Sequence, residues 1–473
     1  MGPGWDRVID ALMEELAAAR DQTWVVGGRL RDALFALPEG DLDLVTAADP
    51  LAVAQGLRAR LGASVARLPR SVRVGVPPSD DDDEPRQIDI TALLTPIEDD
   101  LRQRDFTVDA MALPLPAWAA LRPATDRQGA PVAPADLLDP TGGFADLMNR
   151  LLRTASPTAL RDEPGRVIRG ARLIARHALT PTDETIALAT DASPLMRDLS
   201  TDRLHDELNA LLAAPGCAEG MAFLERVGAF ALLFPELSAP RATAHALGSL
   251  RWTARIQRPA DPEGESDGFN RETPIGRWYA APLSHGAPRV TALRWGLLLH
   301  ALTAHDEGGL PGPRGEQMMT VIPGTRRLLH APERRIAYEI EARASFTARL
   351  IGMREPDERD LRRLFAVAGE VTVDVLVAAA ACVSAQRAEG IMRDDEARLV
   401  VERVRAILAL YFADPARLIP QPLLTGRDLI QALGVTPGPE IHRLLSRVRE
   451  AQLDGDVTTR AEALALAADL PTE

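Results

Sequence analysis

The sequence of 473 residues contains no lysine, so all 54 of its basic residues are arginine. A chain without lysine cannot carry the lysine of a P-loop or of a protein kinase, and it cannot form a Schiff base with a substrate. Cysteine is nearly absent too, since only Cys217 and Cys382 occur and no CxxC spacing exists. Two such residues give neither a disulfide framework nor a thiolate metal site, and we expect both to be small buried hydrophobic side chains.

Long apolar runs are also missing. The richest run, residues 371–383, is interrupted by Asp374, and no run reaches the roughly 18 to 20 residues that a membrane span needs. The first 20 residues carry four acidic side chains where a signal peptide would be basic and then apolar. We therefore expect a cytoplasmic protein with no membrane partner, divided at this length into two to four structural units.

The net charge of −14 would ordinarily argue against a nucleic-acid partner, but the charge is unevenly distributed. Residues 1–110 hold 12 arginines against 21 acidic residues, a balance of −9. Residues 150–177 hold 7 arginines against Asp162 and Glu163, a balance of +5. An acidic N-terminal region is thus followed by a basic segment that suits phosphate groups.

The first 100 residues show short β-branched runs that alternate with helical patterns, which predicts an α/β domain. After residue 147 helical periodicity continues to the C-terminus, and Pro420-Gln421-Pro422 separates a last segment, 423–470. The charged stretch 77–84 is expected to be a solvated loop without a chemical role. The predicted strands are 23–26, 42–45, 64–68, 72–76 and 87–91, and the predicted helices are 29–37 and 50–61. Asp49 is expected to cap the second helix, with Pro50 in its first turn.

Three carboxylates on neighbouring predicted strands are the strongest chemical signal. Asp41 and Asp43 alternate along one strand and so point to the same side of the sheet, and Asp89 lies in a second strand between β-branched residues. Carboxylates held this close repel one another unless a cation lies between them. Such a set suits two Mg²⁺ ions about 3.5–4 Å apart, although Asp-x-Asp taken alone more often marks an exposed strand end.

The pair Gly27-Gly28 lies between a predicted strand and helix, where bare backbone N–H groups can bind phosphates. Any tight turn could use two glycines. Followed thirteen residues later by Asp41-x-Asp43, however, the pair becomes a specific signal.

The stretch VVGGRLRDALFALPEGDLDLVT closely resembles the opening motif of the bacterial class of the tRNA nucleotidyltransferase and poly(A) polymerase family. Four further stretches resemble motifs of that family in the expected order: DDLRQRDFTVDAMA, DPTGGFADLMNRLLR, RDEPGRVIRGARLIAR and LTGRDLIQALGVTPGPEIHRLL. The resemblance implies an α/β nucleotidyltransferase head of the polymerase-beta type, followed by an all-α neck, body and tail. The boundaries expected from it are 1–146, 147–215, 216–419 and 420–473.

The resemblance implies addition of C, C and A to the 3′ end of tRNA from CTP and ATP, with Mg²⁺ held by Asp41, Asp43 and Asp89. It leaves open a CC-adding, A-adding or poly(A)-synthesising enzyme, and a non-catalytic RNA-binding protein is a more distant alternative. The expected partner is the tRNA 3′ end and acceptor arm, with no obligate protein partner. The residues expected to bind nucleotide are Gly27, Gly28, Arg31, Arg104, Asp105, Asp162, Glu163, Arg166 and Arg169.

An enzyme that selects C and A without a template must read the base with protein groups. Cytosine and adenine both present an amino donor beside a ring-nitrogen acceptor, so one carboxylate and one arginine accept both and reject U and G. Glu163 and Arg166, three residues apart, are expected to be neighbours on one helix face and to form that pair. The family usually has Glu-Asp where this chain has Asp162-Glu163, so Asp162 is a second candidate, and a plain surface ion pair is the simpler alternative.

Two departures concern the other motifs. In the stretch 99–112 the family's first Arg is Gln103 and its usual Asn is Asp109, which we expect to be paired with an arginine because a free carboxylate would repel a triphosphate. In the body, His245 and His300 resemble the two histidine sites of a metal-dependent phosphohydrolase, but Ala301 stands where that signature has Asp. We therefore expect a degenerate helical domain without hydrolytic activity, and His305-Asp306 to be incidental.

Overall fold

The computed structural model describes residues 3–35, 40–78, 85–121, 131–237, 239–260, 268–283, 286–303 and 331–469. The chain divides into two units, one of residues 1–200 with 223–229 and one of residues 201–222 with 230–473. Most of the acidic loop 77–84, the His305-Asp306 pair and the segment 308–316 lie outside the described residues.

The first unit is built on a mixed sheet whose described strands lie in the order β3-β4-β5-β2-β1-β6. The strands β2 and β5 are parallel, and every other neighbouring pair is antiparallel. Val25, Leu44 and Ile88 are buried on one face and Val26 and Val45 on the other, because successive side chains of a strand point to opposite faces. The strands are β1 (Thr23–Val26), β2 (Leu42–Thr46), β3 (Ser64–Arg67), β4 (Val72–Val76), β5 (Arg86–Ala92) and β6 (Ala112–Pro114).

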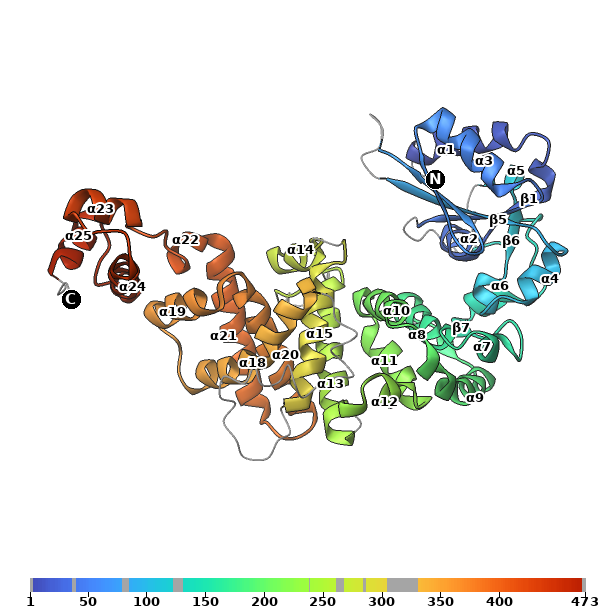
Figure 1. Cartoon of the computed structure of the whole chain (residues 1–473). Coiled ribbons are helices and arrows are strands. Elements are labelled where there is room, and N and C mark those ends of the chain that lie inside the picture. The colour runs from blue at the N-terminus through green and yellow to red at the C-terminus, as the bar shows by residue number, and fades with distance from the viewer. Residues whose placement is uncertain are drawn as a thin grey trace. The chain divides into compact units, whose positions relative to one another are not determined.

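Helices α1 (Pro3–Glu15) and α3 (Pro50–Leu61) lie together on one face of this sheet, and α2 (Gly27–Leu34) lies on the other (Figure 1). The predicted cap of α3 is present, since the Asp49 side chain accepts a hydrogen bond from the Leu51 N–H. The prediction for α2 was wrong at its start. The helix begins at Gly27, so the two glycines form its first turn instead of a separate turn before it.

The rest of the first unit is mostly helical. Its elements are α4 (Ile97–Arg102), α5 (Leu115–Ala119), α6 (Gly143–Met148), β7 (Leu151–Leu152), α7 (Ala159–Asp162), α8 (Arg166–His177), β8 (Thr180–Pro181) and α9 (Asp183–Ala192). The short parallel pair of β7 and β8 is a departure from the expected all-α neck. The strand β6 was also not predicted, because three residues show too little alternation.

Two glycines fix the motif of residues 99–112 between α6 and α8. A Cβ at Gly143 would lie 1.9 Å from the Thr107 carbonyl oxygen, and one at Gly170 would lie 2.8 Å from the Phe106 ring. Any larger residue would push these segments apart. The α8 helix therefore packs directly on the motif that carries Arg104, Asp105 and Asp109.

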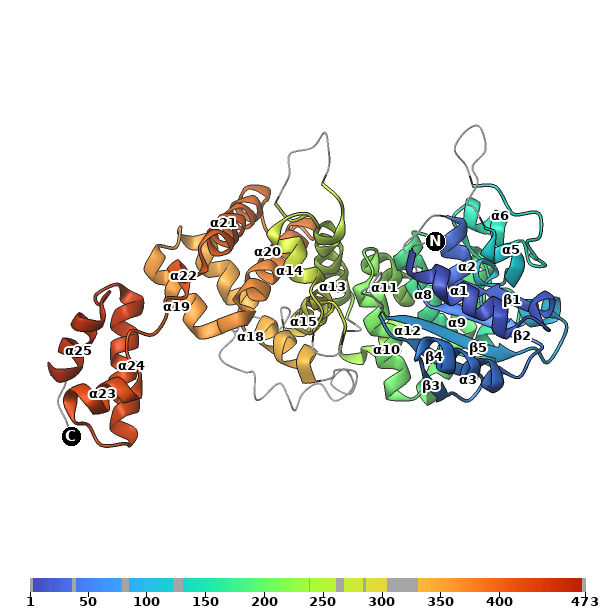
Figure 2. The ribbon, with the colours of Figure 1, turned by 90° about the horizontal axis from the view of Figure 1, so that it is seen from above.

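The second unit is helical throughout its described residues. Its core is α20, a helix that is apolar on all sides and buried against α13, α15, α18 and α21. Figure 1 and Figure 2 both show α20 among these helices. The helices are α10 (Thr201–Ala213), α11 (Cys217–Arg226), α12 (Ala229–Leu233), α13 (Pro240–Thr253), α14 (Pro274–Ala280), α15 (Arg289–Thr303), α18 (Ala331–Met353), α19 (Glu358–Ala368), α20 (Thr372–Ala388), α21 (Asp394–Ala413) and α22 (Pro415–Leu418), of which α11 and α12 cross the division between the units.

The last segment forms a small helical group after the Pro420-Gln421-Pro422 break, with a core of its own. Its helices are α23 (Gly426–Leu433), α24 (Pro439–Asp454) and α25 (Arg460–Asp469). Asp454 joins it to α19 through ion pairs with Arg359 and Arg363.

Among the described helices, none is by itself long and apolar enough to span a membrane. Residues Glu358–Val367 and Thr372–Ala388 pass that test only as a pair bent by 108°. The predicted class, an α/β head followed by helices, is confirmed, whereas the four predicted domain boundaries stay predictions.

Candidate active site

The junction of β1 and α2 brings backbone against a carboxylate. Gly27 adopts a φ of 70°, a left-handed conformation that favours glycine. A Cβ at this position would lie 3.1 Å from Oδ2 of Asp43 and 3.5 Å from the Arg104 guanidinium. Glycine therefore lets the first turn of α2 lie directly beside the Asp43 side chain.

The sheet register places the predicted carboxylates together. Asp43 on β2 is the direct partner of Asp89 on the parallel strand β5, and Asp41 lies just before β2. Burial raises the pKa of Asp43 from 3.8 to about 6, with Arg104 opposing and Asp89 adding to the rise. Burial, followed by repulsion from Asp89, raises the pKa of Asp41 as well. Asp89 thus makes ionisation of both Asp41 and Asp43 less favourable, as a cation site would require.

The three side chains do not form a closed cage in this structure. Both oxygens of Asp89 accept hydrogen bonds from Arg73, at 2.9 and 2.8 Å, and Asp41 accepts one from Gln87 at 2.8 Å. Within the described part of the chain, Asp41, Asp43 and Asp89 are not a set whose ligand atoms all lie within 4.8 Å of one another. The expectation of three carboxylates facing only a cation was therefore too simple, because β4 pairs with β5 and brings Arg73 opposite Asp89.

Arginines from the neck helix face these carboxylates across a cavity of about 190 Å³. Arg169 was predicted from the sequence, but Arg172 and Arg176 were not. Their spacing of three and then four residues places all three on one face of α8, and this periodicity is the signal that could have found them. The cavity is lined by Gly28, Arg29, Arg31, Asp32, Gly40, Asp41, Asp43, Asp89, Asp109, Arg169, Arg172, Leu173 and Arg176.

Asp109 is paired as predicted. It forms ion pairs with Arg31 and, at 3.5 Å, with Arg169. Burial by itself would raise the pKa of Asp109, but Arg31, Arg169 and Arg172 outweigh it and hold the pKa below the usual 3.8. The carboxylate therefore stays ionised and holds two arginines at the cavity wall.

A second buried carboxylate, Asp32, was missed by the sequence reasoning. It pairs with Arg31 at 2.8 Å and with Arg176 at 3.1 Å, so it ties α2 to α8. The neighbouring His177 is kept neutral, because burial first and then Arg31 lower its pKa to about 3. The positive charge at this wall thus belongs to arginines.

Arg104 and Asp105 were predicted to contact ribose and triphosphate, and both are engaged within the protein. Arg104 pairs with Asp100 at 3.2 Å and donates to the Asp109 carbonyl at 3.4 Å. Asp105 is 5% exposed and pairs with Arg169 at 2.8 Å. Their observed contacts position the arginines of the cavity, and neither residue lines it.

The two residues predicted to read the base do contact each other, although they do not lie on one helix. Glu163 and Arg166 form an ion pair at 3.3 Å, although α7 ends at Asp162 and α8 begins at Arg166. One helix was expected to carry both. Pro164 disfavours helical geometry at Glu163, whose φ and ψ are −144° and 86°. The pair is partly exposed and lies outside the lining of the carboxylate cavity, and Asp162 is exposed at the end of α7.

This arrangement suits a polyphosphate held with a divalent cation. One wall carries carboxylate oxygens, the ligands that Mg²⁺ prefers, and the other carries planar guanidinium groups that match phosphate. The raised pKa of the mostly buried Asp43 fits the ion on physical grounds, because a cation beside the carboxylate would offset the burial, and the smaller repulsion from Asp89, that keep its proton bound.

Comparisons with known proteins agree with this chemistry. A family described as "Probable RNA and SrmB- binding site of polymerase A" matches residues 179–239, and one described as "tRNA nucleotidyltransferase domain 2 putative" matches residues 360–468. The chain is 30% identical over 468 residues to the CC-adding tRNA nucleotidyltransferase of Thermus thermophilus, covering 93% of the chain and 92% of that protein. It is 29% identical over 472 residues to the A-adding tRNA nucleotidyltransferase of Deinococcus radiodurans, covering 93% and 94%. A crystal structure of the Bacillus stearothermophilus CCA-adding enzyme in complex with CTP matches with a TM-score of 0.61 and 20% identity, over 98% of the chain and 97% of that structure.

Proposed function

Because the chain belongs to the class II tRNA nucleotidyltransferase family, we propose that it adds CMP and AMP from CTP and ATP to the 3′ end of tRNA, building the CCA end and releasing pyrophosphate. The cavity between carboxylates and neck arginines carries this proposal, since it fits a nucleoside triphosphate with its cation. The expected division of labour is a head at 1–146, a neck at 147–215, a body at 216–419 and a tail at 420–473. We place the reaction in the cytoplasm, where tRNA is matured.

Asp41 and Asp43 would hold Mg²⁺, with Asp89 as the third predicted ligand. When bound, Mg²⁺ activates a 3′ hydroxyl and neutralises the departing pyrophosphate. Asp89 can ligate only if it releases Arg73, whereas Asp43 forms no comparable ion pair with the described residues and lies beside the first turn of α2. Asp43 is therefore the central ligand of the proposed site.

The remaining cavity residues would position the triphosphate. The N–H groups of Gly27 and Gly28 lie at the start of α2, where the helix dipole favours negative charge. Arg31, Arg169, Arg172 and Arg176 add charge at the opposite wall. Arg104 and Asp105 would contribute by holding Arg169 and the motif around Asp109 in place.

Selection of the base would use Glu163 and Arg166, with Asp162 as the alternative carboxylate. The carboxylate accepts from the exocyclic amino group, and the guanidinium donates to the ring nitrogen. The ion pair between Glu163 and Arg166 supports this proposal, because it would hold the two groups together before a nucleotide arrives and so lower the entropy lost on binding.

The body and tail would bind the acceptor arm of the tRNA. A cavity of about 630 Å³ in the body is lined by five arginines against one glutamate, an excess of positive charge that suits phosphate. The arginines are Arg251, Arg255, Arg387, Arg398 and Arg405, and the glutamate is Glu402.

A second candidate is a partial activity, addition of CC alone or of A alone. It is favoured by one observation, that the relatives aligned with 93% of this chain include two CC-adding enzymes and one A-adding enzyme. The two candidates share the cavity and differ only in which nucleotides the neck accepts at each step.

Product analysis separates these candidates. Radiolabelled CTP and ATP are supplied separately and together to tRNA that ends before the CCA, after one C and after two C residues. A CCA-adding enzyme extends all three to the same end, a CC-adding enzyme stops before A, an A-adding enzyme extends only the last, and a poly(A) polymerase adds long tails of A.

The Asp41→Ala variant tests the site in the same assay and should abolish all incorporation. Asp21→Asn, which removes the charge of an exposed carboxylate on the same unit, should keep full activity. Retained incorporation by Asp41→Ala would refute the carboxylate site.

A further inference from the structure

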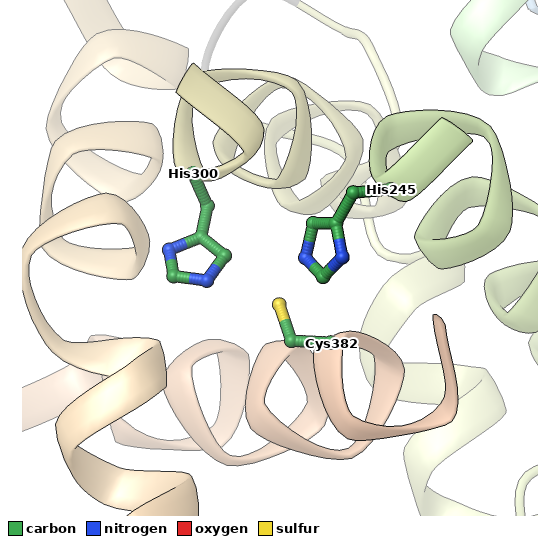
Figure 3. A group of neighbouring side chains, drawn as sticks. All are labelled: His245, His300 and Cys382. Carbon is green, nitrogen blue, oxygen red and sulfur yellow. The ribbon is translucent and has the colours of Figure 1, made fainter. Parts of the chain in front are cut away.

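Three helices of the body bring two histidines and a cysteine together. His245 comes from α13, His300 from α15 and Cys382 from α20, and Figure 3 shows their side chains converging on one point. One ligand atom of each residue lies within 4.8 Å of the others. All three side chains are at most 2% exposed. Residues separated by 137 positions in the chain thus form a single buried cluster.

The groups around the cluster orient the two imidazole rings. Glu389 lies 3.0 Å from Nδ1 of His245, and the Ser345 hydroxyl lies 3.1 Å from Nε2 of His300. A carboxylate on one ring nitrogen fixes the tautomer in which the other nitrogen carries the lone pair that a metal uses. Metal-binding histidines usually have such a hydrogen-bond partner on the ring nitrogen that does not bind the metal.

We propose that His245, His300 and Cys382 bind one Zn²⁺ ion, which fastens α13, α15 and α20 together. Imidazole nitrogen and thiolate sulfur are ligands of Zn²⁺, and they discriminate against Mg²⁺, which requires oxygen. The site is therefore chemically distinct from the carboxylates of the head and independent of the proposed nucleotide addition.

The cluster differs from the phosphohydrolase signature that the sequence suggested. Ala301 supplies no carboxylate after His300, so the expected ligand is absent as predicted. Cys382, from a helix 81 positions further along, stands beside the histidines instead. The expectation that both cysteines would be only small buried hydrophobic residues was incomplete, since Cys217 fits it and Cys382 faces two metal-binding side chains.

An ion could reach the cluster from one side. Cys382 and Ser345 also line a cavity of about 410 Å³ bounded by α18, α20 and α21. Three protein ligands leave one position of a tetrahedral Zn²⁺ site, and this cavity offers room there for a water molecule. Burial raises the pKa of the Cys382 thiol to about 12, so an entering ion must displace its proton, as thiolate-binding metals do.

Cobalt substitution tests the proposal on the full-length protein. Co²⁺ bound to a thiolate gives an intense charge-transfer absorption in the near ultraviolet that oxygen-bound Co²⁺ lacks. After treatment with a chelator and removal of the chelator, the protein titrated with Co²⁺ should develop this band to one equivalent per chain. Zn²⁺ added afterwards should displace the cobalt and remove the band, and elemental analysis should then find one zinc per chain.

Paired cysteine variants localise the ion. Cys382→Ala should abolish the charge-transfer band and weaken Zn²⁺ binding at least about tenfold, whereas Cys217→Ala, at an equally buried cysteine, should keep both. The double variant Asp41→Ala/Asp43→Ala should also keep the band, which separates this site from the head. Circular dichroism shows whether each variant is folded.

The titration of wild-type protein can contradict the proposal by itself. The test therefore does not depend on whether each variant folds. Absence of the band in wild-type protein, or its persistence in folded Cys382→Ala, would show that the three residues are merely packed polar groups of the core. Loss of nucleotide addition in the double variant with the band intact would affect neither conclusion.

Discussion

The head and the body each gather metal-binding side chains, but in opposite surroundings. In the head, Asp41, Asp43 and Asp89 offer only oxygen and face arginines across a cavity. In the body, His245, His300 and Cys382 offer nitrogen and sulfur within a core of apolar helices. The first site can exchange charged substrates, whereas the second is enclosed.

This difference shows how one chain can keep two ions apart without separate compartments. Burial acts on both sites, raising the pKa of Asp43 and of Cys382, yet the ligand atoms decide which ion replaces the protons. Hard oxygen ligands beside guanidinium groups suit an ion that arrives with a triphosphate. Imidazole and thiolate within a core of apolar helices suit an ion that stays.

The largest expected effect separates the two sites most directly. Asp43→Asn keeps the shape of the side chain but removes the charge that would hold Mg²⁺. We expect kcat/KM for nucleotide addition to fall at least about 10³-fold, which corresponds to about 4 kcal/mol in the activation barrier. The zinc content of the body should not change.

Steady-state incorporation of CMP and elemental analysis of the same preparation check both halves of this prediction. Asp21→Asn serves as the control for the loss of a surface carboxylate. If Asp43→Asn also lost zinc, the two sites would be coupled and the comparison would break down.

The pH dependence of stability should differ between metal-free and metal-bound protein. Since folding raises the pKa of Asp43 from 3.8 to about 6, the protonated form is favoured in the folded state. The stability it contributes is complete below pH 3.8 and is lost as the pH rises through about 6, by at most about 3 kcal/mol at 1.36 kcal/mol per pH unit. Mg²⁺ should restore stability above that range by replacing the proton.

Thermal unfolding in a chelator at about pH 5 and about pH 7.5 measures this effect. Wild-type protein should lose stability between the two values, whereas Asp43→Asn, which cannot ionise there, should lose less. Adding Mg²⁺ at the higher pH should stabilise wild-type protein more than the variant. Parallel pH curves for the two proteins would mean that Asp43 is already paired in the absence of a cation.

A smaller effect concerns the choice of nucleotide. Glu163→Gln and Arg166→Ala should each lower the preference for CTP over UTP by about 10- to 100-fold, because a buried polar group without its partner is what rejects the wrong base. Arg166 also donates to the Ala159 carbonyl at 3.1 Å, so its replacement alone could disturb the start of α8. Base selection is therefore assigned to this pair only if both variants lower the preference for CTP over UTP.

The ratio of kcat/KM for CTP and UTP is the informative measurement, since a general loss of folding lowers both. Arg161→Ala, at an exposed neighbour on α7, should leave the ratio unchanged. An unaltered ratio in Glu163→Gln with an altered one in Asp162→Asn would assign base reading to Asp162.

The sequence predicted those parts of the head that depend on local pattern. The strands around Val25, Leu44 and Ile88 were found from their short runs of β-branched residues, and the cap at Asp49 followed from its position before Pro50. The strand β6 was missed because its pairing with β1, across the intervening residues 27–111, supplies the stability that its own three residues lack.

The contacts of the candidate site were predicted less well, since they depend on register and packing. Asp43 and Asp89 were identified from their strands, but the pairing of Arg73 with Asp89 follows from the β4–β5 register, which the sequence does not specify. Similarly, nothing near Cys382 in the sequence indicates histidines on two other helices. The helical spacing of Arg172 and Arg176 after Arg169 is different, because it could have been recognised in the sequence and was overlooked.

The smallest expected effect tests whether the contrast between the units extends to their arginines. In the head those facing the cavity are paired with the buried Asp32, Asp105 and Asp109, whereas in the body cavity Arg251 and Arg387 are paired with the exposed Glu219 and Asp394. Removing two, as in Arg251→Ala/Arg398→Ala, should weaken tRNA binding only a few-fold at moderate salt. It should also lower the slope of log Kd against log salt by about 1 to 2, because each phosphate contact contributes about 0.7 to 0.9.

Filter binding across a range of salt concentrations gives this slope, and saturating tRNA should restore the wild-type rate of addition. Arg277→Ala, which removes an exposed arginine of α14 outside the cavity, is the matched control. If it changed the slope as much as each of the other two, the body would attract tRNA through its overall charge, and the cavity would have no special part in binding.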